Sequence, residues 1–387
     1  MIENYFPNAE DFDEMADHLA SIAYALGRQV DVSDWRGVQD AVKKGLAPTI
    51  FPIGTQLMVN HSTYGDVPYT VVAHNHFKNA QSKDAPTMTL MCQKVLLPSN
   101  LSSSYAPVPV SYDAPEAFYR AEKELRDEIY NVTVPYTVGE LEAGTYNFSL
   151  VDSDMQAYPI GTRLCLTTIA DGSPIVELYH YESNSYLGDA HLTKGDKGIS
   201  LGTFGVELNH LHRVLYGSNN YSESAIRHYL NNEAAKPTKH ILHGEYDVPA
   251  GWINTNDGFI YGLDSGLRDS IVEVIVPCTT NDTFESPNSD TVVGEPYTLV
   301  DKVFLPSATE LGYNVGNSAT NSAVLPYFKN ATNEVRIRYY NDVPRRYWTR
   351  TPENRNAFGV VCAGIDGAMT NIQASNSSGI VPMFNIG

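Results

Sequence analysis

The spacing of apolar residues changes from a helical to a strand period at Phe51, and this change limits the chain to folds that combine helices with strands. Upstream of Phe51, apolar residues recur at alternating steps of three and four, which places them on one stripe of a helix. These residues are Phe12, Met15, Leu19, Ile22 and Leu26, and Gly27 follows as a stop signal. The stripe fits either a self-association or attachment helix or a helix that packs on its own domain.

A second short helix is expected directly before the change of period. Ser33 is the candidate N-cap, Asp34 lies in the first turn, and Gly45 follows two lysines as a stop signal. The face toward the core would carry Trp35, Val38 and Val42. The sequence therefore predicts two helices ahead of the first strand.

Downstream of Phe51, apolar residues gather in short, mostly alternating runs separated by turn-forming residues, as expected of β-strands. Three such runs open this region, and two more lie in the second half of the chain. They cover residues 53–60, 69–76, 88–96, 271–278 and 298–306.

The part of the chain between these groups is predicted to be an insertion. Residues 114–130 interleave acidic and basic side chains in the manner of a solvated helix. Runs at 144–151, 162–169 and 175–183 then predict a separate small β unit that reaches to about Gly198.

The clearest helix of the second half follows this insertion. Ser222 is its candidate cap, Glu223 lies in the first turn, and the inward face would carry Ile226, Tyr229 and Leu230. Helices and strands are not arranged in the repeated strand, helix, strand order of a parallel sheet. The sequence therefore predicts an α+β fold.

The charge balance excludes some classes of partner. The chain has 45 acidic against 26 basic residues, a net charge of −19. Nucleic-acid affinity comes largely from Lys and Arg that displace counterions, so no nucleic acid is expected as a partner. The start lacks the pattern of a signal peptide and no run approaches a membrane span, so we expect export by another route and no membrane insertion.

Sequence motifs that carry catalysis are missing: there is no GxGxxG, P-loop, GxSxG or HExxH. Carboxylates such as Glu207 and Glu310 form no motif-level pair, and in so acidic a chain they are expected to be solvated. Two histidine pairs fit either a metal or acid–base site or, preferred without a third ligand, polar side chains at a strand end. These are His74 with His76 and His210 with His212. We therefore expect no catalytic residue, metal or cofactor.

The last segment, residues 347–387, is poor in charge and rich in small residues. It reads YWTRTPENRNAFGVVCAGIDGAMTNIQASNSSGIVPMFNIG, and after Pro352 its charged residues are Glu353, Arg355 and Asp366. The abundance of Gly, Ser, Asn, Thr and Ala argues against an ordinary buried strand core.

Six stretches of the chain carry a resemblance to a known family. They are RVLYGSNNYSESAIRHYLN, PAGWINTNDGFIYGL, VIVPC, DKVFLPSATELG, RYWTRTP and GIVPMFNI. In this combination the chain resembles the variable proteins of diversity-generating retroelements, a phage and gut-bacterial branch of the C-type-lectin-like domains that is distantly related to a phage major tropism determinant. The resemblance extends over residues 51–98, most of 201–387 and the paired N-terminal helices.

The resemblance implies a division of the chain. Residues 1–49 would be a helical segment for attachment or oligomerisation, 50–110 the first part of a C-type-lectin-like domain, and 111–199 an inserted β-rich unit. Residues 200–387 would be the main part of that domain, with the variable ligand-binding region at 347–387.

In that family the C-terminal segment alternates fixed anchors with permissive stretches. The anchors are present here as Trp348, Arg350, Thr351, Pro352, Asp366, Gly367, Gly379 and Pro382. A core Trp, a turn-fixing Pro and an Asp-Gly hairpin turn would hold such a frame, so side chains between the anchors can change without loss of core packing.

The family diversifies by adenine-directed mutagenesis, mostly at Asn codons, so variable positions hold residues reachable by changes in the first two bases. The positions that satisfy this rule and are expected to bind ligand are Asn354, Arg355, Asn356, Phe358, Gly359, Val361, Cys362, Gly364, Thr370, Asn371, Ile372, Ser375 and Ser378. Glu353, Met369 and Gln373 do not satisfy it. Phe358, Val361, Cys362 and Ile372 would be the apolar contacts if exposed, whereas a buried Cys362 would be only a small hydrophobe. Without the resemblance, ordinary surface hairpins would be the preferred interpretation.

The resemblance implies a non-enzymatic receptor-binding or adhesion protein of a tailed phage or prophage, displayed on the virion with other tail or head fibre proteins. Its partner would be a bacterial surface protein or glycan, and a homo-oligomer, with a trimer favoured, would give multivalent attachment. The PENRN stretch only loosely matches the calcium site of animal lectins, so no calcium is expected.

Two alternatives remain open at this point. One is a bacterial lectin-like binding protein of fixed specificity. The other is an enzyme of the formylglycine-generating type, whose chemistry needs a cysteine pair that the scattered Cys92, Cys165, Cys278 and Cys362 do not suggest.

Overall fold

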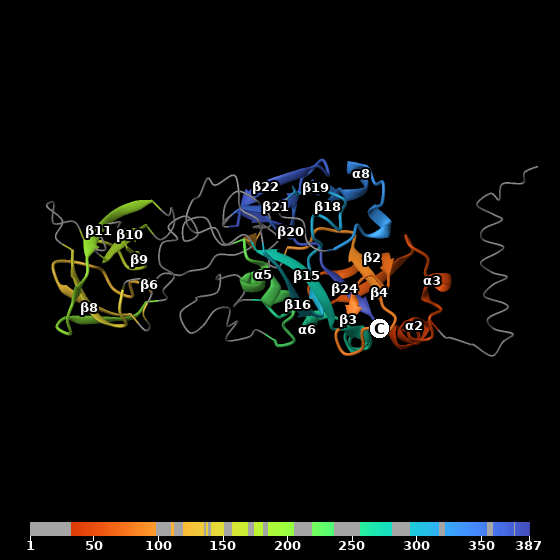
Figure 1. Ribbon diagram of the computed structural model, residues 1–387, viewed down its shortest axis with the longest axis horizontal. Coiled ribbons are helices and arrows are strands. Elements are labelled where there is room, and N and C mark those ends of the chain that lie inside the picture. Colours follow the sequence, from red (N-terminus) through yellow and green to blue (C-terminus); the bar gives the residue numbers. More distant parts are fainter. Residues whose placement is uncertain are drawn as a thin grey trace, which may run out of the picture.

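The structure is a computed structural model, and strands far outnumber helices in the part of it that is described (Figure 1). The described residues are 32–97, 110–111, 119–134, 137, 141–150, 157–168, 174–180, 185–204, 219–235, 256–280, 295–316, 322–353, 359–374 and 376–387. The chain is a mixed α+β protein, as the sequence predicts. Among these residues, no helix has the length and hydropathy needed to cross a membrane.

The central sheet joins the two ends of the described chain. It contains, in spatial order, β1 (Gln56–His61), β2 (Gly65–His74), β4 (Met88–Cys92), β24 (Met383–Ile386) and β14 (Ile271–Val272), and β17 (Val303–Phe304) also pairs with β24. The C-terminal strand β24 runs antiparallel to β4, with Phe384 opposite Leu90. The strands predicted at 53–60, 69–76 and 88–96 are confirmed as β1, β2 and β4.

Short helices surround this sheet. They are α2 (Trp35–Lys43), α3 (Ala47–Ile50), α5 (Ala225–Leu230), α6 (Phe259–Gly262), α7 (Ser265–Ser270) and α8 (Asn333–Arg336), with 3-10 turns η1 (Tyr221–Glu223) and η4 (Pro326–Phe328). The predicted inward faces of α2 and α5 are confirmed, with Val38, Val42, Ile226, Tyr229 and Leu230 buried and Trp35 half-buried against the core. The helix predicted over 12–26 lies outside the described residues.

Both predicted caps are wrong by one or two residues. Asp34, not Ser33, caps α2, because its carboxylate accepts a hydrogen bond from the Gly37 amide at 2.8 Å. Ser224, not Ser222, caps α5 through a bond from the Arg227 amide at 3.2 Å. In each case the residue directly before the first helical turn has the oxygen that reaches an unpaired amide.

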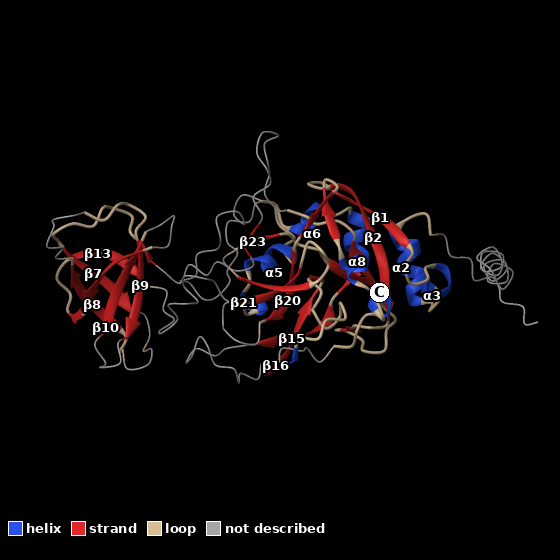
Figure 2. Ribbon diagram, turned by 90° about the horizontal axis from the view of Figure 1, so that it is seen from above, coloured by secondary structure: helices blue, strands red, loops and turns tan. Residues whose placement is uncertain are grey.

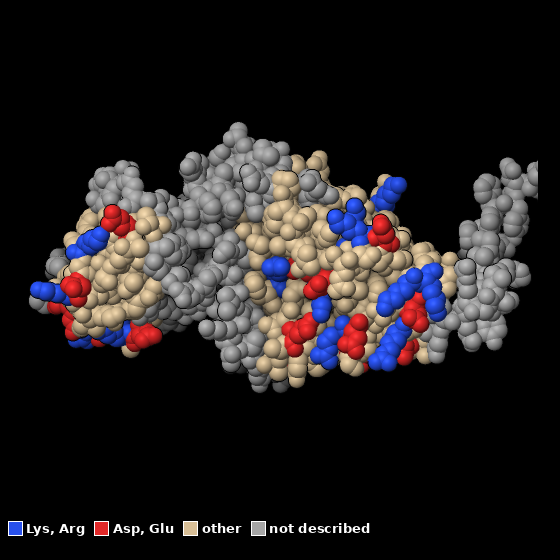
Figure 3. Space-filling model, turned by 60° about the horizontal axis from the view of Figure 1, so that its bottom comes forward, with Lys and Arg blue, Asp and Glu red and all other residues tan. Residues whose placement is uncertain are grey.

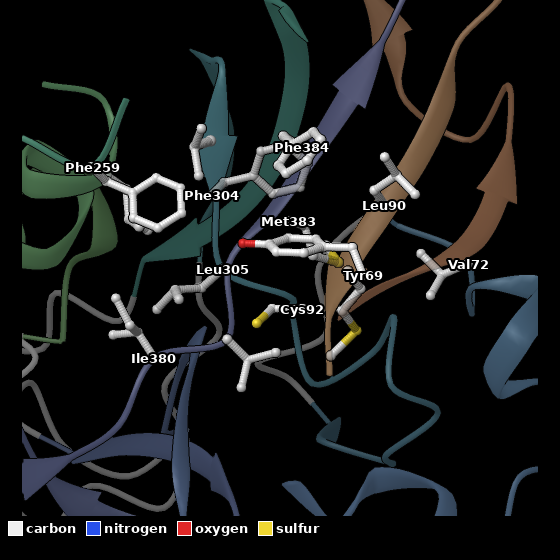
Figure 4. Close-up of a cluster of buried hydrophobic side chains, with 14 of the residues drawn as sticks. Tyr69, Val72, Leu90, Cys92, Phe259, Phe304, Leu305, Ile380, Met383 and Phe384 are labelled. Carbon is white, nitrogen blue, oxygen red and sulfur yellow. The ribbon is translucent and has the colours of Figure 1, made fainter. Parts of the chain in front are cut away.

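The main hydrophobic core lies between the central sheet and its surrounding elements. Figure 4 shows Tyr69, Leu90 and Phe384 facing one another, and the rings of Tyr69 and Phe384 lie 5.0 Å apart. The same cluster takes in Phe304 and Ile380, both fully buried. Residues from both halves of the sequence therefore close one core, so the C-terminal segment is an integral part of the fold.

Smaller sheets flank the central one. One contains β16 (Glu295–Asp301), β15 (Val274–Thr280) and β3 (Lys78–Asn79), another β20 (Tyr347–Pro352), β21 (Gly359–Ala363) and β22 (Met369–Gln373). Two-stranded pairs join β18 (Arg338–Tyr340) with β19 (Val343–Arg345), and β23 (Ser377–Ser378) with β5 (Val110–Ser111). The strands predicted at 271–278 and 298–306 are confirmed in outline as β14 with β15 and β16 with β17.

The predicted insertion forms a separate group of strands (Figure 2), and its buried residues make up a hydrophobic core of their own. Its two four-stranded sheets contain β6 (Tyr119–Arg120), β7 (Ile129–Val134), β8 (Gly144–Ser149), β9 (Arg163–Thr168), β10 (Pro174–Tyr179), β11 (Tyr186–His191), β12 (Thr193–Lys194) and β13 (Ile199–Thr203). The predicted strands at 144–151, 162–169 and 175–183 are β8, β9 and β10.

The helix predicted over 114–130 is wrong in its described part. Leu125 exchanges two backbone hydrogen bonds with Tyr158, at 2.8 and 2.9 Å, and the Ala121 amide donates to the Thr162 carbonyl. Ala121 and Leu125 are both buried in the core of this unit. Their spacing of four fits a helix, but tertiary pairing holds the segment as irregular strand.

Candidate functional site

Strand β20 supplies a rigid base for the C-terminal hairpins. All six of its residues are buried, and the Trp348 side chain is fully enclosed in the main core. The Thr349 hydroxyl donates to the Val361 carbonyl at 2.6 Å, and the Thr351 hydroxyl accepts from the Ala308 amide at 2.9 Å. The expectation that Trp348 anchors in the core is confirmed.

Arg350, an expected framework residue, forms a fully buried ion pair with Glu310. Its guanidinium donates to both carboxylate oxygens, and one Nη also donates to the Leu305 carbonyl at 2.6 Å. Burial alone would raise the pKa of Glu310, but the charge and hydrogen bonds of Arg350 outweigh it and hold the pKa below its usual value. The expectation that Glu310 is solvated is wrong, because the fold buries it against Arg350.

The hairpin of β21 and β22 turns at the predicted Asp-Gly pair. The Asp366 carboxylate accepts from the Ala368 amide at 3.0 Å, and Gly367 has φ of +73°, a left-handed conformation that favours glycine. The Gly364 amide donates to the Ala368 carbonyl at 2.7 Å, and the Tyr313 hydroxyl donates to the Gly367 carbonyl at 2.6 Å. The turn is therefore fixed both by its own bonds and by a neighbouring loop.

The structure separates the expected ligand-binding residues into three groups. The first group lies in β21, where Gly359, Val361 and Cys362 are buried. These three cannot contact a ligand, and their assignment is corrected: β21 is the middle strand of its sheet, with Val361 packed against Ala308 and Val315. Cys362 is the small buried hydrophobe of the alternative interpretation.

The second group lies on the edge strand β22 or borders the groove beside it. Asn371 is exposed, Thr370 and Ile372 are half-buried, and Gly364 and Ser378 are buried but border a groove. The third group lies outside the described residues: Asn354, Arg355, Asn356, Phe358 and Ser375.

A groove of about 760 Å³ lies beside this hairpin. Its walls come from the turn between β21 and β22 with the start of β22, from the end of β19 and the residue after it, from β23, and from the residues that follow β4. They include Val95, Leu97, Pro344, Arg345, Arg346, Gly364, Ile365, Asp366, Ala368, Met369, Thr370, Ser377, Ser378 and Gly379. Its volume lies in the range of small-ligand pockets and of pockets that receive a few side chains of a partner.

Sequence reasoning missed the most accessible apolar residues of this groove. Ile365 is 62% exposed and Met369 42% exposed. Met369 does not satisfy the codon rule, and neither Met369 nor Ile365 is among the expected ligand-binding residues. Their position beside the Asp-Gly turn is the sequence feature that could have predicted their exposure, because apolar side chains next to a tight turn have no neighbouring strand to cover them.

The predicted histidine pair His74 and His76 forms hydrogen bonds within the fold. His74 Nε2 bonds to the Phe51 carbonyl at 2.9 Å and His76 Nε2 to the Ser322 hydroxyl at 3.3 Å. In the described ranges, no group of three His, Cys, Asp or Glu residues could hold a metal ion. His210 and His212 lie outside those ranges. Burial raises the pKa of both the Cys92 and Cys278 thiols to about 12.

Comparison with known proteins adds a family match for the part of the chain that supplies most of the groove lining. Residues 195–387 match the family described as Domain of unknown function (DUF6273). No curated protein matches the chain, and no solved structure does either. The matched range takes in β13, all elements from η1 to β24, and thus both the buried frame and the β21–β22 hairpin.

Proposed function

We propose that this chain is a non-enzymatic receptor-binding or adhesion protein, which presents the β21–β22 hairpin and its groove to a ligand on a bacterial surface. The observation that carries the proposal is the contrast within the hairpin. Its inner strand β21 is buried along its whole length, whereas β22 and the turn expose Ile365, Met369 and Asn371. A buried inner strand with an exposed outer strand is the arrangement that a changeable binding face requires.

The physical basis is that the frame and the surface are separate. The frame holds Trp348 and Arg350 in the core, with Asp366 and Gly367 fixing the turn. Exposed positions away from caps and special backbone angles usually shift stability by about 0.5 kcal/mol or less when substituted. Positions on β22 can therefore take new side chains while the frame keeps their backbone in place.

The resemblance of the sequence to retroelement variable proteins supplies the biological setting of the proposal. On that basis the domain is C-type-lectin-like, the ligand is a bacterial surface protein or glycan, and the protein belongs to a phage particle. Weak single sites would gain strength from display in several copies, for which a trimer is the favoured form. Of the expected assembly segment, residues 1–49, the part up to residue 31 lies outside the described residues.

The environment of the cysteines supports a binding role over the enzymatic alternative. Cys278 and Cys362 are both buried, and burial raises the pKa of each thiol above its usual value. A nucleophilic cysteine needs an accessible thiolate, which is the form that these surroundings disfavour. A binding module of fixed specificity remains the second candidate, since a buried frame with an exposed edge serves it equally well.

Deep sequencing of the 3′ end of the gene in its source population tests the diversification part of the proposal. Substitutions should concentrate at the codons of Thr370, Asn371 and Ile372 and be absent from those of Trp348 and Pro352. A flat profile would remove diversification and leave the fixed-specificity binder.

Binding itself is tested by adding the fluorescently labelled full chain to a panel of intact bacterial strains. The variant T370A/N371A should lose binding to any strain that the wild type recognises. The matched control K78A/Q81A changes two polar residues away from the hairpin and should bind as the wild type does. Equal binding by the hairpin variant would place the ligand site elsewhere.

A further inference from the structure

Two adjacent arginines border the groove on the side formed by β19 and β20. Arg345 is exposed and Arg346 half-buried. Neither forms an ion pair with an acidic residue that the structure describes, and the buried Nε of Arg346 has no hydrogen-bond partner among those residues. In a chain with a net charge of −19, such a pair is a local reversal of sign. Free guanidinium groups beside a groove are suited to carboxylates, which they bind through paired N–H donors.

Several other lining residues of the groove are apolar. Ile365 and Met369 flank the turn, and Pro344 adds an apolar surface next to the arginines. Methionine adapts its shape to irregular partners, and Met and Arg are both enriched at protein interfaces. The acidic residue of this wall, Asp366, already accepts the Ala368 amide within the turn, so its carboxylate is engaged in holding the hairpin.

The groove thus places cationic and apolar surfaces side by side. We infer that it binds an acidic segment of a partner protein in which an aliphatic side chain neighbours a carboxylate. This inference rests on the proposed function and names its ligand class. The aliphatic side chain would lie against Ile365 and Met369, and the carboxylate would pair with Arg345 and Arg346.

The lining favours a peptide over a sugar. None of the described lining residues is aromatic, so there is no ring on which the apolar face of a sugar would stack. On the face that Figure 3 shows, basic and acidic side chains are intermixed, so that face offers no field of one sign for an acidic partner. Because Arg345 and Arg346 line the groove, the binding of an acidic segment there should weaken as salt screens the charges.

A selection from a random dodecapeptide library displayed on phage, with the immobilised full chain as the target, tests this inference. Enriched peptides should share an Asp or Glu within two positions of Leu, Ile, Val or Met. Resynthesised and followed by fluorescence anisotropy, they should bind R345Q/R346Q at least about tenfold more weakly, as expected for the loss of charge-assisted contacts. M369Q should also weaken them.

The control variant K78Q/K329Q removes the same number of positive charges from exposed sites outside the groove and should bind as the wild type does. Thermal unfolding checks that all variants are folded, and R345Q alone serves if the double variant is not. The inference is overturned if no peptide is enriched, if enriched peptides lack acidic residues, if both double variants lose affinity equally, or if alginate, a carboxylated polysaccharide, shows the arginine dependence in place of peptides.

These outcomes are distinct from failure of the proposed function. Cell binding that depends on Thr370 and Asn371 but not on the two arginines would keep the binding role and reject the acidic peptide. Arginine-dependent peptide binding with a flat codon profile would keep the groove and reject diversification.

Discussion

The guanidinium of Arg350 lies against the carboxylate of Glu310, and both side chains are fully excluded from solvent. Glu310 also accepts the Ser307 amide at 2.9 Å and the Ser322 hydroxyl at 2.7 Å, so its oxygens are saturated with donors. The pair joins β20, which carries the C-terminal hairpins, to the loop that follows β17. It is therefore the electrostatic connection between the candidate binding surface and the main core.

Replacing Glu310 by Gln should destabilise the main core strongly. The variant leaves Arg350 charged in a site that is excluded from solvent, and breaking a buried pair on one side typically costs about 3–5 kcal/mol. Urea unfolding followed by tryptophan fluorescence measures this, because Trp35, Trp252 and Trp348 all lie outside the inserted β unit in sequence. The double variant E310L/R350M should recover part of the loss. A change below about 0.5 kcal/mol in E310Q would contradict the assigned role.

Stability should fall as the pH drops from about 6.5 to 4, in part because of His61. Its Nδ1 accepts the Thr63 amide at 3.1 Å and its Nε2 bonds to the Phe259 carbonyl at 3.0 Å, so the buried ring is held neutral. Burial lowers its pKa to about 4, while the unfolded chain keeps a value near 6.5. Between these values the unfolded state binds the proton more readily, and folding loses about 3 kcal/mol across the window.

The variant H61Q isolates this contribution. The glutamine amide offers a donor group and an acceptor group but does not titrate. The free energy of unfolding of H61Q should therefore depend less steeply on pH between 6.5 and 4 than that of the wild type. Parallel pH profiles for the two proteins would show that His61 is not the responsible group.

Much of the fold follows from the period of the apolar residues. The alternating runs that became β1, β2 and β4 were recognisable because strand periodicity is local. The prediction of a helix over 114–130 is wrong because the buried positions Ala121 and Leu125 are four residues apart. That spacing puts two side chains on the same side of a helix and also of an extended segment. The deciding partner, Tyr158, lies far along the sequence, and no local pattern reveals it.

The candidate site was predictable as a segment but not residue by residue. Composition set the last segment apart, and the family resemblance placed Asp366 and Gly367 at its turn. The codon rule, however, says which residues mutation can reach and does not say which strand lies in the middle of a sheet. It therefore included Val361 and Cys362 of the buried strand β21 among the expected ligand-binding residues. The same limit applies to Arg345 and Arg346, whose place beside the turn depends on how β19, β20 and β21 pair in space.

Gly367 should not accept a side chain. A Cβ there would meet the backbone carbonyl of Asn333, in addition to the strain of a left-handed φ of +73°. Gly54, with φ of +99° and open space around its would-be Cβ, is the matched control for strain alone. G367A should therefore be less stable than G54A by about 1–3 kcal/mol, the usual cost of overpacking, in thermal unfolding. Equal losses would mean that the contact with Asn333 yields easily.

The two strands of the hairpin should differ in their tolerance of substitution. N371S changes an exposed side chain on β22 and should shift the free energy of unfolding by about 0.5 kcal/mol or less. V361S removes a buried side chain from β21 and places a hydroxyl against Ala308 and Val315, at a cost of about 2–3 kcal/mol. Similar losses in urea unfolding would remove the separation of frame and surface on which the proposed function depends.

The four cysteines should resist alkylation in the folded protein. Cys92, Cys165, Cys278 and Cys362 are all buried. Burial raises the pKa of Cys278 to about 12, so at pH 8 only about one thiol in 10⁴ carries the reactive thiolate, against roughly a quarter of an ordinary cysteine. Iodoacetamide labelling followed by mass spectrometry should modify each site only after unfolding in urea, which is the positive control. Rapid labelling of Cys278 or Cys362 in the folded chain would restore the thiol enzyme as a candidate, because it would show an accessible, ionised nucleophile.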